Sequence, residues 1–117
     1  MLRFWQATIN TRNGLVFAIR SEQAVREELM ALAFAVPLAW LIGVTTMRRV
    51  ELIAAVVLVL VTELLNTAIE KLADRLTTEP YPQIGRVKDM GSAAVGVALV
   101  MAGLFWLFAI AERMGVV

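Results

Sequence analysis

The segment Glu63-Leu64-Leu65-Asn66-Thr67-Ala68-Ile69-Glu70 continues an apolar run that begins near Leu52, and it decides how this chain folds. At about 100° per residue, Glu63, Asn66 and Glu70 fall within roughly 60° of one another on one helical face, and Asp74 extends that stripe. A carboxylate at mid-membrane costs about 2.5–3.5 kcal/mol, so two of them on one face of a membrane helix require a partner. The simplest partners are a metal ion, a cationic side chain or a proton.

The chain has 117 residues, of which 60% are hydrophobic, compared with about 45–50% in ordinary soluble domains. Its apolar residues gather in three stretches, at residues 29–47, 52–69 and 93–110. Each stretch has about 18 residues, enough at about 1.5 Å per residue to cross a hydrocarbon core of about 30 Å. A soluble bundle of buried helices is the alternative, but three such stretches in so short a chain argue against it. We therefore expect one all-α membrane domain, residues 1–117, with three transmembrane helices.

Residues 1–28 are expected to form an amphipathic helix on the membrane surface. Apolar side chains such as Trp5 and Phe17 are interspersed with four arginines, and a helix of this kind lies in the plane of the lipid headgroups. The pair Asn13-Gly14 predicts a break that would divide this helix into two shorter pieces. The arginines also interrupt the N-terminal sequence, so we expect no cleavable signal.

The basic residues predict the orientation of the chain in the membrane. Eight of the eleven lysines and arginines lie before the first apolar stretch or between the second and the third. By the positive-inside rule, the N-terminus and the region 71–88 are then cytoplasmic. We expect this region to be a loop, because the two prolines of the string Thr77-Thr78-Glu79-Pro80-Tyr81-Pro82 cannot continue a helix.

Composition also limits the chemistry. The chain has no cysteine and no histidine, which excludes disulfides, thiolate sites and the commonest general base. Any site must therefore use carboxylates, amides, lysine, arginine or hydroxyls, and oxygen ligands favour hard cations such as Mg²⁺. A net charge of +1 gives no sign of nucleic-acid binding. The phosphate-binding loops of soluble kinases and nucleotidases are absent.

The predicted cytoplasmic boundary collects several polar side chains on one surface. Carboxylates beside an asparagine and a lysine are the groups that a Mg²⁺-nucleotide site needs. Proton-coupled transporters place glutamates in the same way, and structural ion pairs at helix ends are commoner than either. Periodicity alone leaves these three interpretations open. The side chains in question are Glu22, Glu27, Glu28, Glu63, Asn66, Glu70, Asp74, Lys88 and Asp89.

Two longer strings resemble a known family. The segment 63–70, followed by Asp74-Arg75 and then by Gly85-Arg86-Val87-Lys88-Asp89-Met90-Gly91-Ser92-Ala93-Ala94, resembles the prokaryotic integral-membrane diacylglycerol kinases. The family pattern, E-x-x-N-[ST]-A-[IV]-E followed by A-K-D-x-x-[SA]-A, is long and rare. The resemblance extends over essentially the whole chain. It implies a homotrimer in the bacterial inner membrane that phosphorylates a lipid alcohol, diacylglycerol, with Mg²⁺ and ATP at the cytoplasmic surface.

The resemblance also implies roles for individual residues. Glu63 would accept the proton of the lipid hydroxyl, and Asn66 would position Glu63. Glu22 and Glu70 would coordinate Mg²⁺ between the ATP phosphates. Lys88 would contact the γ-phosphate, and Ser92 would lie beside the lipid headgroup. Further contacts to ATP would come from Arg3, Glu79, Tyr81 and Asp89.

The sequence departs from the family at two places. The segment Glu79-Pro80-Tyr81-Pro82 is rich in proline and lacks the histidine of many relatives, and Asn10-Thr11-Arg12 stands where Tyr-Ser-Trp is familiar. Two other functions stay open. Undecaprenol would be phosphorylated by the same mechanism, whereas a small proton-coupled multidrug transporter would be a protein of another class. Such transporters usually have four spans with the key glutamate in the first, and residues 29–47 hold no acidic residue.

Overall fold

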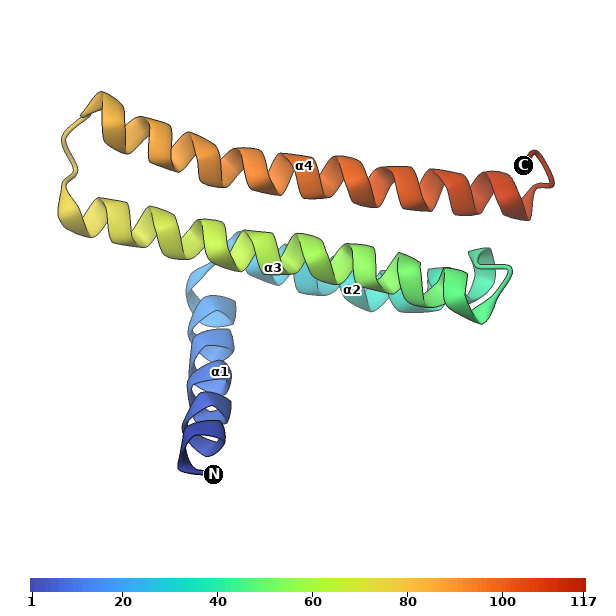
Figure 1. The fold of residues 1–117 in the computed structure, drawn as a ribbon, viewed down its shortest axis with the longest axis horizontal. Coiled ribbons are helices and arrows are strands. Elements are labelled where there is room, and N and C mark those ends of the chain that lie inside the picture. The colour runs from blue at the N-terminus through green and yellow to red at the C-terminus, as the bar shows by residue number, and fades with distance from the viewer.

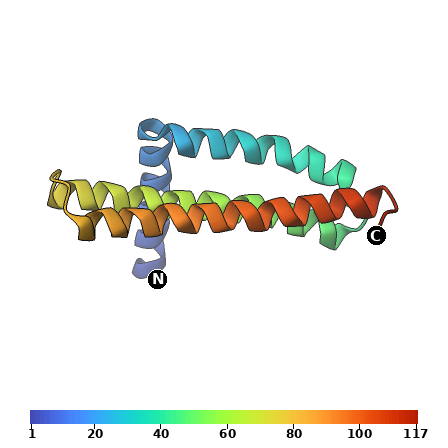
Figure 2. The ribbon, with the colours of Figure 1, turned by 90° about the horizontal axis from the view of Figure 1, so that it is seen from above.

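A computed structural model describes all 117 residues and contains helices only. The four helices are α1 (Leu2–Ser21), α2 (Gln23–Ile42), α3 (Thr46–Leu76) and α4 (Pro82–Arg113). Three of them, α2, α3 and α4, form an antiparallel bundle, while α1 projects away from the bundle (Figure 1). Viewed from above, α4 lies over α3, and α2 lies to one side of the pair (Figure 2).

Small side chains form the contact between the long helices. Ala55 and Val59 of α3 pack against Ala98 and Ala102 of α4, and all four are buried. Small residues allow helix backbones to approach closely, which is the main route to tight packing between membrane helices. Further along the bundle, α2 joins this core through a second buried cluster made by Ala39, Leu52 and Ala109.

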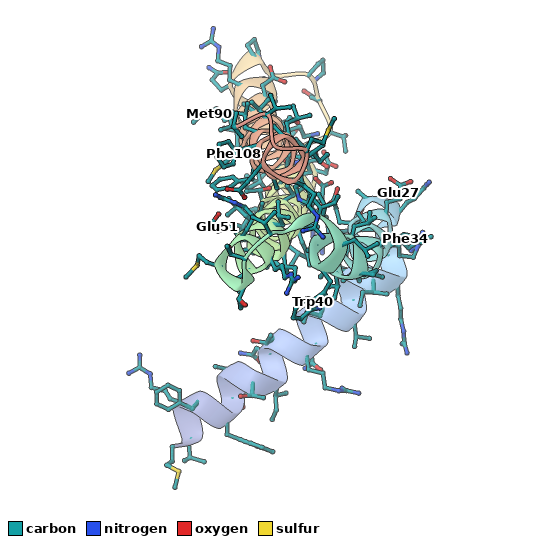
Figure 3. The ribbon with its side chains drawn as sticks, turned by 90° about the vertical axis from the view of Figure 1, so that its right-hand side faces the viewer. Glu27, Phe34, Trp40, Glu51, Met90 and Phe108 are labelled. Atoms are coloured by element: carbon teal, nitrogen blue, oxygen red, sulfur yellow. The ribbon has the colours of Figure 1, made fainter.

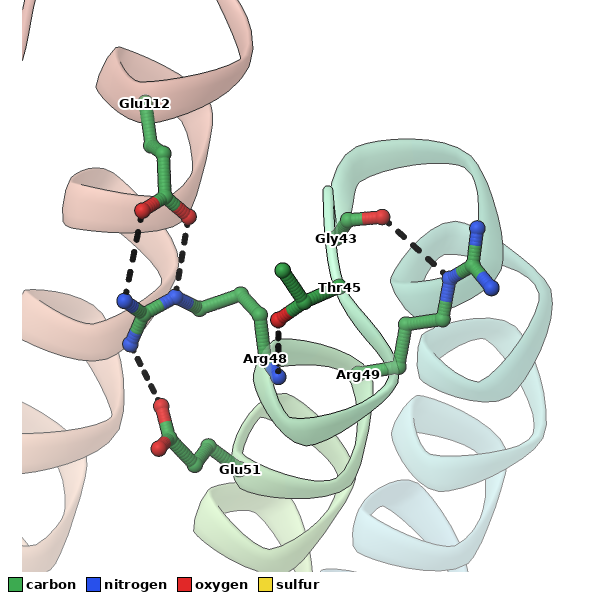
Figure 4. Close-up of polar contacts among 6 residues, drawn as sticks. All are labelled: Gly43, Thr45, Arg48, Arg49, Glu51 and Glu112. Carbon is green, nitrogen blue, oxygen red and sulfur yellow. Dashed lines mark hydrogen bonds and ion pairs between the residues drawn. The ribbon is translucent and has the colours of Figure 1, made fainter.

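Polar contacts fasten the end of the bundle where α2 turns into α3 (Figure 4). Thr45 caps α3 by accepting a hydrogen bond from the Arg48 backbone nitrogen, at 3.1 Å. The Arg48 guanidinium bridges to Glu112 of α4, with Nε 3.0 Å from Oε1, and also pairs with Glu51. Arg49 donates to the Gly43 carbonyl at 3.2 Å, so this turn is tied to both neighbouring helices.

At the opposite end, α3 and α4 are joined by a short loop, as the two prolines predict. Helix α3 ends at Leu76, and Pro82 is the first residue of α4, where its missing N–H costs nothing. The predicted loop region 71–88 is therefore wrong in its extent, because residues 71–76 and 82–88 are helical and only 77–81 connect them. The helices thus extend beyond the apolar stretches by about two turns in α3 and about three turns in α4.

Helix α1 is continuous, and the predicted break at Asn13-Gly14 is wrong. A glycine within a helix costs only about 1 kcal/mol relative to alanine, which one long helix can absorb. The actual break lies at Glu22, whose backbone is extended. There Arg26 donates to the carbonyl oxygens of Ile19 and Arg20 at 2.9 and 3.2 Å, and so caps the end of α1.

Two of the helices, α3 and α4, are long and apolar enough to cross a membrane. The first apolar stretch predicts a helix as far as residue 47, but α2 ends at Ile42 and a three-residue turn follows. Its apolar part, residues 29–42, is about 21 Å long, which is less than a hydrocarbon core of about 30 Å. Three transmembrane helices therefore remain a prediction, whereas the all-helical fold is confirmed.

Many large apolar side chains on the outside of the bundle are exposed. Phe34 of α2 is 66% exposed and points away from α4, as does the charged Glu27 nearer the start of the helix (Figure 3). On α4, Val97, Leu104 and Leu107 are each more than 60% exposed. Such surfaces are expected where lipid or another apolar surface replaces water.

Leu52 offers a test of the packing, because its side chain is fully buried between Ala39 and Ala109. We expect Leu52→Ala to lower the free energy of unfolding by about 2–5 kcal/mol through loss of packing and the cavity that remains. Titration with SDS in mixed micelles, followed by circular dichroism, measures this quantity. The matched control is Leu107→Ala, where the leucine is 66% exposed. Equal losses in the two variants would contradict the packing described.

Candidate functional site

The predicted polar stripe lies on α3, at the end of the bundle where α2 begins, α3 ends and α4 begins. Asn66 donates from Nδ2 to Oε1 of Glu70, at 3.2 Å. Glu63 lies one turn before Asn66 and within electrostatic reach of Glu70. The three side chains that the sequence placed on one face are therefore neighbours in the structure.

Asn66 is the most buried member of this stripe, with only 8% of its surface exposed. Its carboxamide oxygen, Oδ1, is buried without a hydrogen-bond partner. The oxygen faces Gly91 of α4, where no side chain stands in its way. Because a buried acceptor without a donor destabilises a fold, the position of Asn66 calls for an explanation other than stability.

Glu22 reaches the same region from the junction between α1 and α2. Its carboxylate pairs with Nζ of Lys71 on α3, at 2.7 Å. The same ammonium lies over the ring of Phe17, 5.3 Å from its centroid, so that one lysine contacts both α1 and the junction. The sequence did not single out Lys71, because nothing in the local pattern shows that α1 crosses α3 at this point.

A cavity of about 440 Å³ lies between α1 and α3. Apolar side chains such as Leu15, Phe17 and Leu64 form much of its wall, and Glu22 and Lys71 provide charged groups. The cavity therefore combines apolar and charged side chains, which suits an amphipathic molecule.

Carboxylates outnumber cations in this region. The charges of Glu22, Glu27 and Glu70 all act on Glu63. Burial, and then the charges of Glu63 and Glu27, raise the pKa of Glu28, which precedes the first apolar stretch. The chain does not bring three carboxylates close enough together to form a metal site by themselves. The excess of hard oxygen donors is nevertheless the chemistry that suits Mg²⁺, which commonly binds one or two carboxylates together with phosphates.

On α4, Lys88 pairs with Asp74, two helical turns beyond Asn66 along α3. The pair bridges the two helices close to the loop 77–81, and both side chains keep substantial exposure to solvent. Ser92 is exposed one turn after Lys88. Asp89 is also exposed, about 160° around the helix from Gly91, which packs on α3.

The remaining predicted residues lie apart from this cluster. Glu79 and Tyr81 are exposed in the loop that joins α3 to α4. Arg3 lies near the outer end of α1, which projects away from the bundle (Figure 1). One chain therefore brings together Glu63, Asn66 and Glu70, with Glu22 beside them, but it does not bring Arg3 to the same place.

The chain is similar to known bacterial proteins. A family model described as prokaryotic diacylglycerol kinase matches residues 10–110. Proteins named diacylglycerol kinase from Haemophilus influenzae and Escherichia coli K12 are 40% and 41% identical to the chain, over 80% and 87% of its length and 79% and 84% of theirs. One of the same name from Pseudomonas aeruginosa is 38% identical, over 89% of this chain and 85% of its own.

The contacts of Lys71 predict its effect on α1. Removing the ammonium in Lys71→Ala breaks the pair with Glu22 and the contact with Phe17, each worth about 0.5–1 kcal/mol. We expect amide hydrogen exchange in residues 15–21 to accelerate about five-fold, while exchange around Leu52 stays unchanged. Lys71→Arg is the control, because it keeps the charge. An unchanged exchange rate in Lys71→Ala would show that α1 is held by other contacts.

Proposed function

Because the chain belongs to the prokaryotic diacylglycerol kinase family, we propose that it phosphorylates diacylglycerol to phosphatidic acid, with Mg²⁺ and ATP, at the cytoplasmic surface of the bacterial inner membrane. The observation that carries this proposal is the cluster Glu63–Asn66–Glu70 on α3. It stands where the apolar part of α3 gives way to turns that carry charged side chains. A lipid hydroxyl and a water-soluble nucleotide can meet at such a boundary.

In this mechanism Glu63 is the general base. Its carboxylate takes the proton of the lipid hydroxyl as the hydroxyl oxygen attacks the γ-phosphorus of ATP in line with the bond to the β–γ bridging oxygen. That bond breaks and ADP leaves with the bridging oxygen, while the lipid oxygen keeps the phosphoryl group. The proton on Glu63 then passes to solvent. No phosphorylated protein intermediate is needed, because both substrates meet in one site.

Glu22 and Glu70 are the proposed ligands of Mg²⁺. When bound, the ion would neutralise the charge of the ATP phosphates. The surplus of carboxylates around Glu63 and the hydrogen bond from Asn66 that orients Glu70 support this assignment. Glu22 pairs with Lys71 in the structure. If Mg²⁺ binds, the Glu22 carboxylate would contact both the ion and the Lys71 ammonium.

Lys88 is proposed to stabilise the γ-phosphate. Its ammonium projects from α4 toward α3, where Asp74 holds it near the solvent-exposed turns. A phosphate carries more charge than a carboxylate, so it can draw the ammonium away from Asp74. Ser92, one turn further along α4, would lie beside the lipid headgroup, and Arg3, Glu79, Tyr81 and Asp89 would contact the nucleotide.

The complete site is proposed to form in a homotrimer. One chain leaves Arg3 far from the α3 cluster, and large parts of α3 and α4 are apolar and exposed. Neighbouring copies could supply the missing contacts and cover part of these surfaces. With α2 as a third span, the N-terminus and the loop 77–81 would both be cytoplasmic, in agreement with the distribution of basic residues.

The substrate is proposed to be diacylglycerol rather than undecaprenol, because the similar proteins from three bacteria carry the name diacylglycerol kinase. The cavity between α1 and α3 could accept the glycerol end of such a lipid, with its apolar wall beside the acyl chains. A multidrug transporter is not supported, since the family match extends over most of the chain.

The decisive experiment presents Mg²⁺, γ-labelled ATP and mixed micelles of either lipid to the purified protein. We expect label in phosphatidic acid, and we expect Glu63→Gln to lower kcat by at least about 10²-fold, as the loss of a general base implies. Size-exclusion chromatography with light scattering checks that the variant keeps its oligomeric state. Label only in the polyprenol would change the substrate, and label in neither lipid would refute the kinase proposal.

Lys88 supplies a second test. We expect Lys88→Met to lower kcat about 10²-fold or more with a smaller change in the KM for ATP, because the contact strengthens as charge develops in the transition state. Arg86→Met is the control, since it removes an exposed positive charge from the same turn, about 160° around the helix. If both variants keep full activity, Lys88 has no part in phosphoryl transfer.

A further inference from the structure

Gly91 is the glycine of α4 that packs against the polar stripe of α3. It is buried, and a Cβ atom at this position would collide with Oδ1 of Asn66. A Cβ built at Gly85, Gly96 or Gly103 meets nothing within 4 Å. The conformation of the Asn66 side chain therefore requires glycine at this one position of α4, and that side chain belongs to the proposed site.

The neighbour that Gly91 accommodates is held in an unusual way. The Asn66 carboxamide turns its oxygen toward α4, where no donor meets it, and turns its amino group toward Glu70. Rotation of the side chain away from Gly91 would move the amino group as well, because both atoms belong to one rigid plane. The space left by the missing side chain thus determines where the amino group points.

We infer that Gly91 is a positioning residue that acts through Asn66 to orient the Glu70 carboxylate. This inference rests on the proposed function, in which Glu70 holds the metal–nucleotide complex. The absence of a side chain at position 91 leaves the Asn66 oxygen in place, and the amino group then donates to Oε1 of Glu70. This hydrogen bond would hold the Glu70 carboxylate in position for the metal–nucleotide complex. A methyl group at position 91 would displace the carboxamide and release Glu70.

The test measures metal binding directly. Mn²⁺ affinity in the presence of a non-hydrolysable ATP analogue is determined by electron paramagnetic resonance, and the Mg²⁺ concentration for half-maximal rate is measured beside it. We expect Gly91→Ala to weaken Mn²⁺ binding and to raise the Mg²⁺ requirement about ten-fold, as the loss of a hydrogen bond to a charged group implies. Gly96→Ala, in the same helix with open space at its Cβ, should change neither quantity.

A double-mutant cycle tests whether Gly91 acts through Asn66. Asn66→Ala should weaken Mn²⁺ binding by about the same factor as Gly91→Ala, and adding Gly91→Ala to it should cause no further loss. Independent, additive losses would overturn the inference, as would a Gly91→Ala variant that binds Mn²⁺ like Gly96→Ala. If the Gly91→Ala variant fails to fold, an unchanged Mn²⁺ affinity in Asn66→Ala still refutes a positioning role through Asn66.

These outcomes are distinct from a failure of the proposed function. In that case the unmodified protein would neither transfer phosphate to a lipid nor bind Mn²⁺ with the nucleotide analogue. If it does both, the comparison of the alanine variants tests the positioning role alone.

Discussion

The close contact between α3 and α4 is the constraint on which the rest of the structure depends. Alanines such as Ala98 and Ala102 let the two backbones approach in the middle of the pair. That approach brings Arg48 to Glu112 at one end of the pair and Lys88 to Asp74 at the other. Between these ends it places Gly91 against Asn66, so the same packing that forms the core also shapes the polar cluster.

The two ends of the bundle use their charges differently. At the turn between α2 and α3, Arg48 and Arg49 contact carboxylates, a backbone carbonyl and aromatic rings, which gives a structural network. At the opposite end, an amide oxygen is left without a donor and carboxylates repel one another. Unsatisfied groups in an otherwise well-packed protein are expected where a ligand binds.

The helical class and the polar face of α3 could be predicted from periodicity, because both depend on spacing within one helix. The end of α2 and the start of α3 could not, because apolar residues continue through Val44 and the helix stops only where Gly43 and Thr45 form a turn. The break at Glu22, instead of Asn13-Gly14, depends on the cap that Arg26 supplies from the next helix. Contacts made across helices have no signature in local sequence.

The difference between spacing within one helix and contacts between helices also explains which site residues the sequence did not identify. Glu63, Asn66 and Glu70 were identified from their own spacing and from the family resemblance, whereas Lys71 and Gly91 matter only because other helices meet them. From the sequence alone, Gly91 is expected to be a packing residue. Its further role is visible only in the structure, where its neighbour is the buried carboxamide of Asn66.

The charges around the polar cluster are not balanced within one chain. The two lysines near the cluster are already engaged, Lys71 by Glu22 and Lys88 by Asp74. Glu63 and Glu70 have no cationic partner of this kind, although they repel each other and lie at the edge of an apolar helix. A cation from outside the chain would balance their charge. A metal ion that arrives with a polyphosphate would balance the carboxylates, and the phosphate would in turn compete with Asp74 for Lys88. The resting ion pairs thus hold both lysines close to the place where phosphoryl transfer would need positive charge.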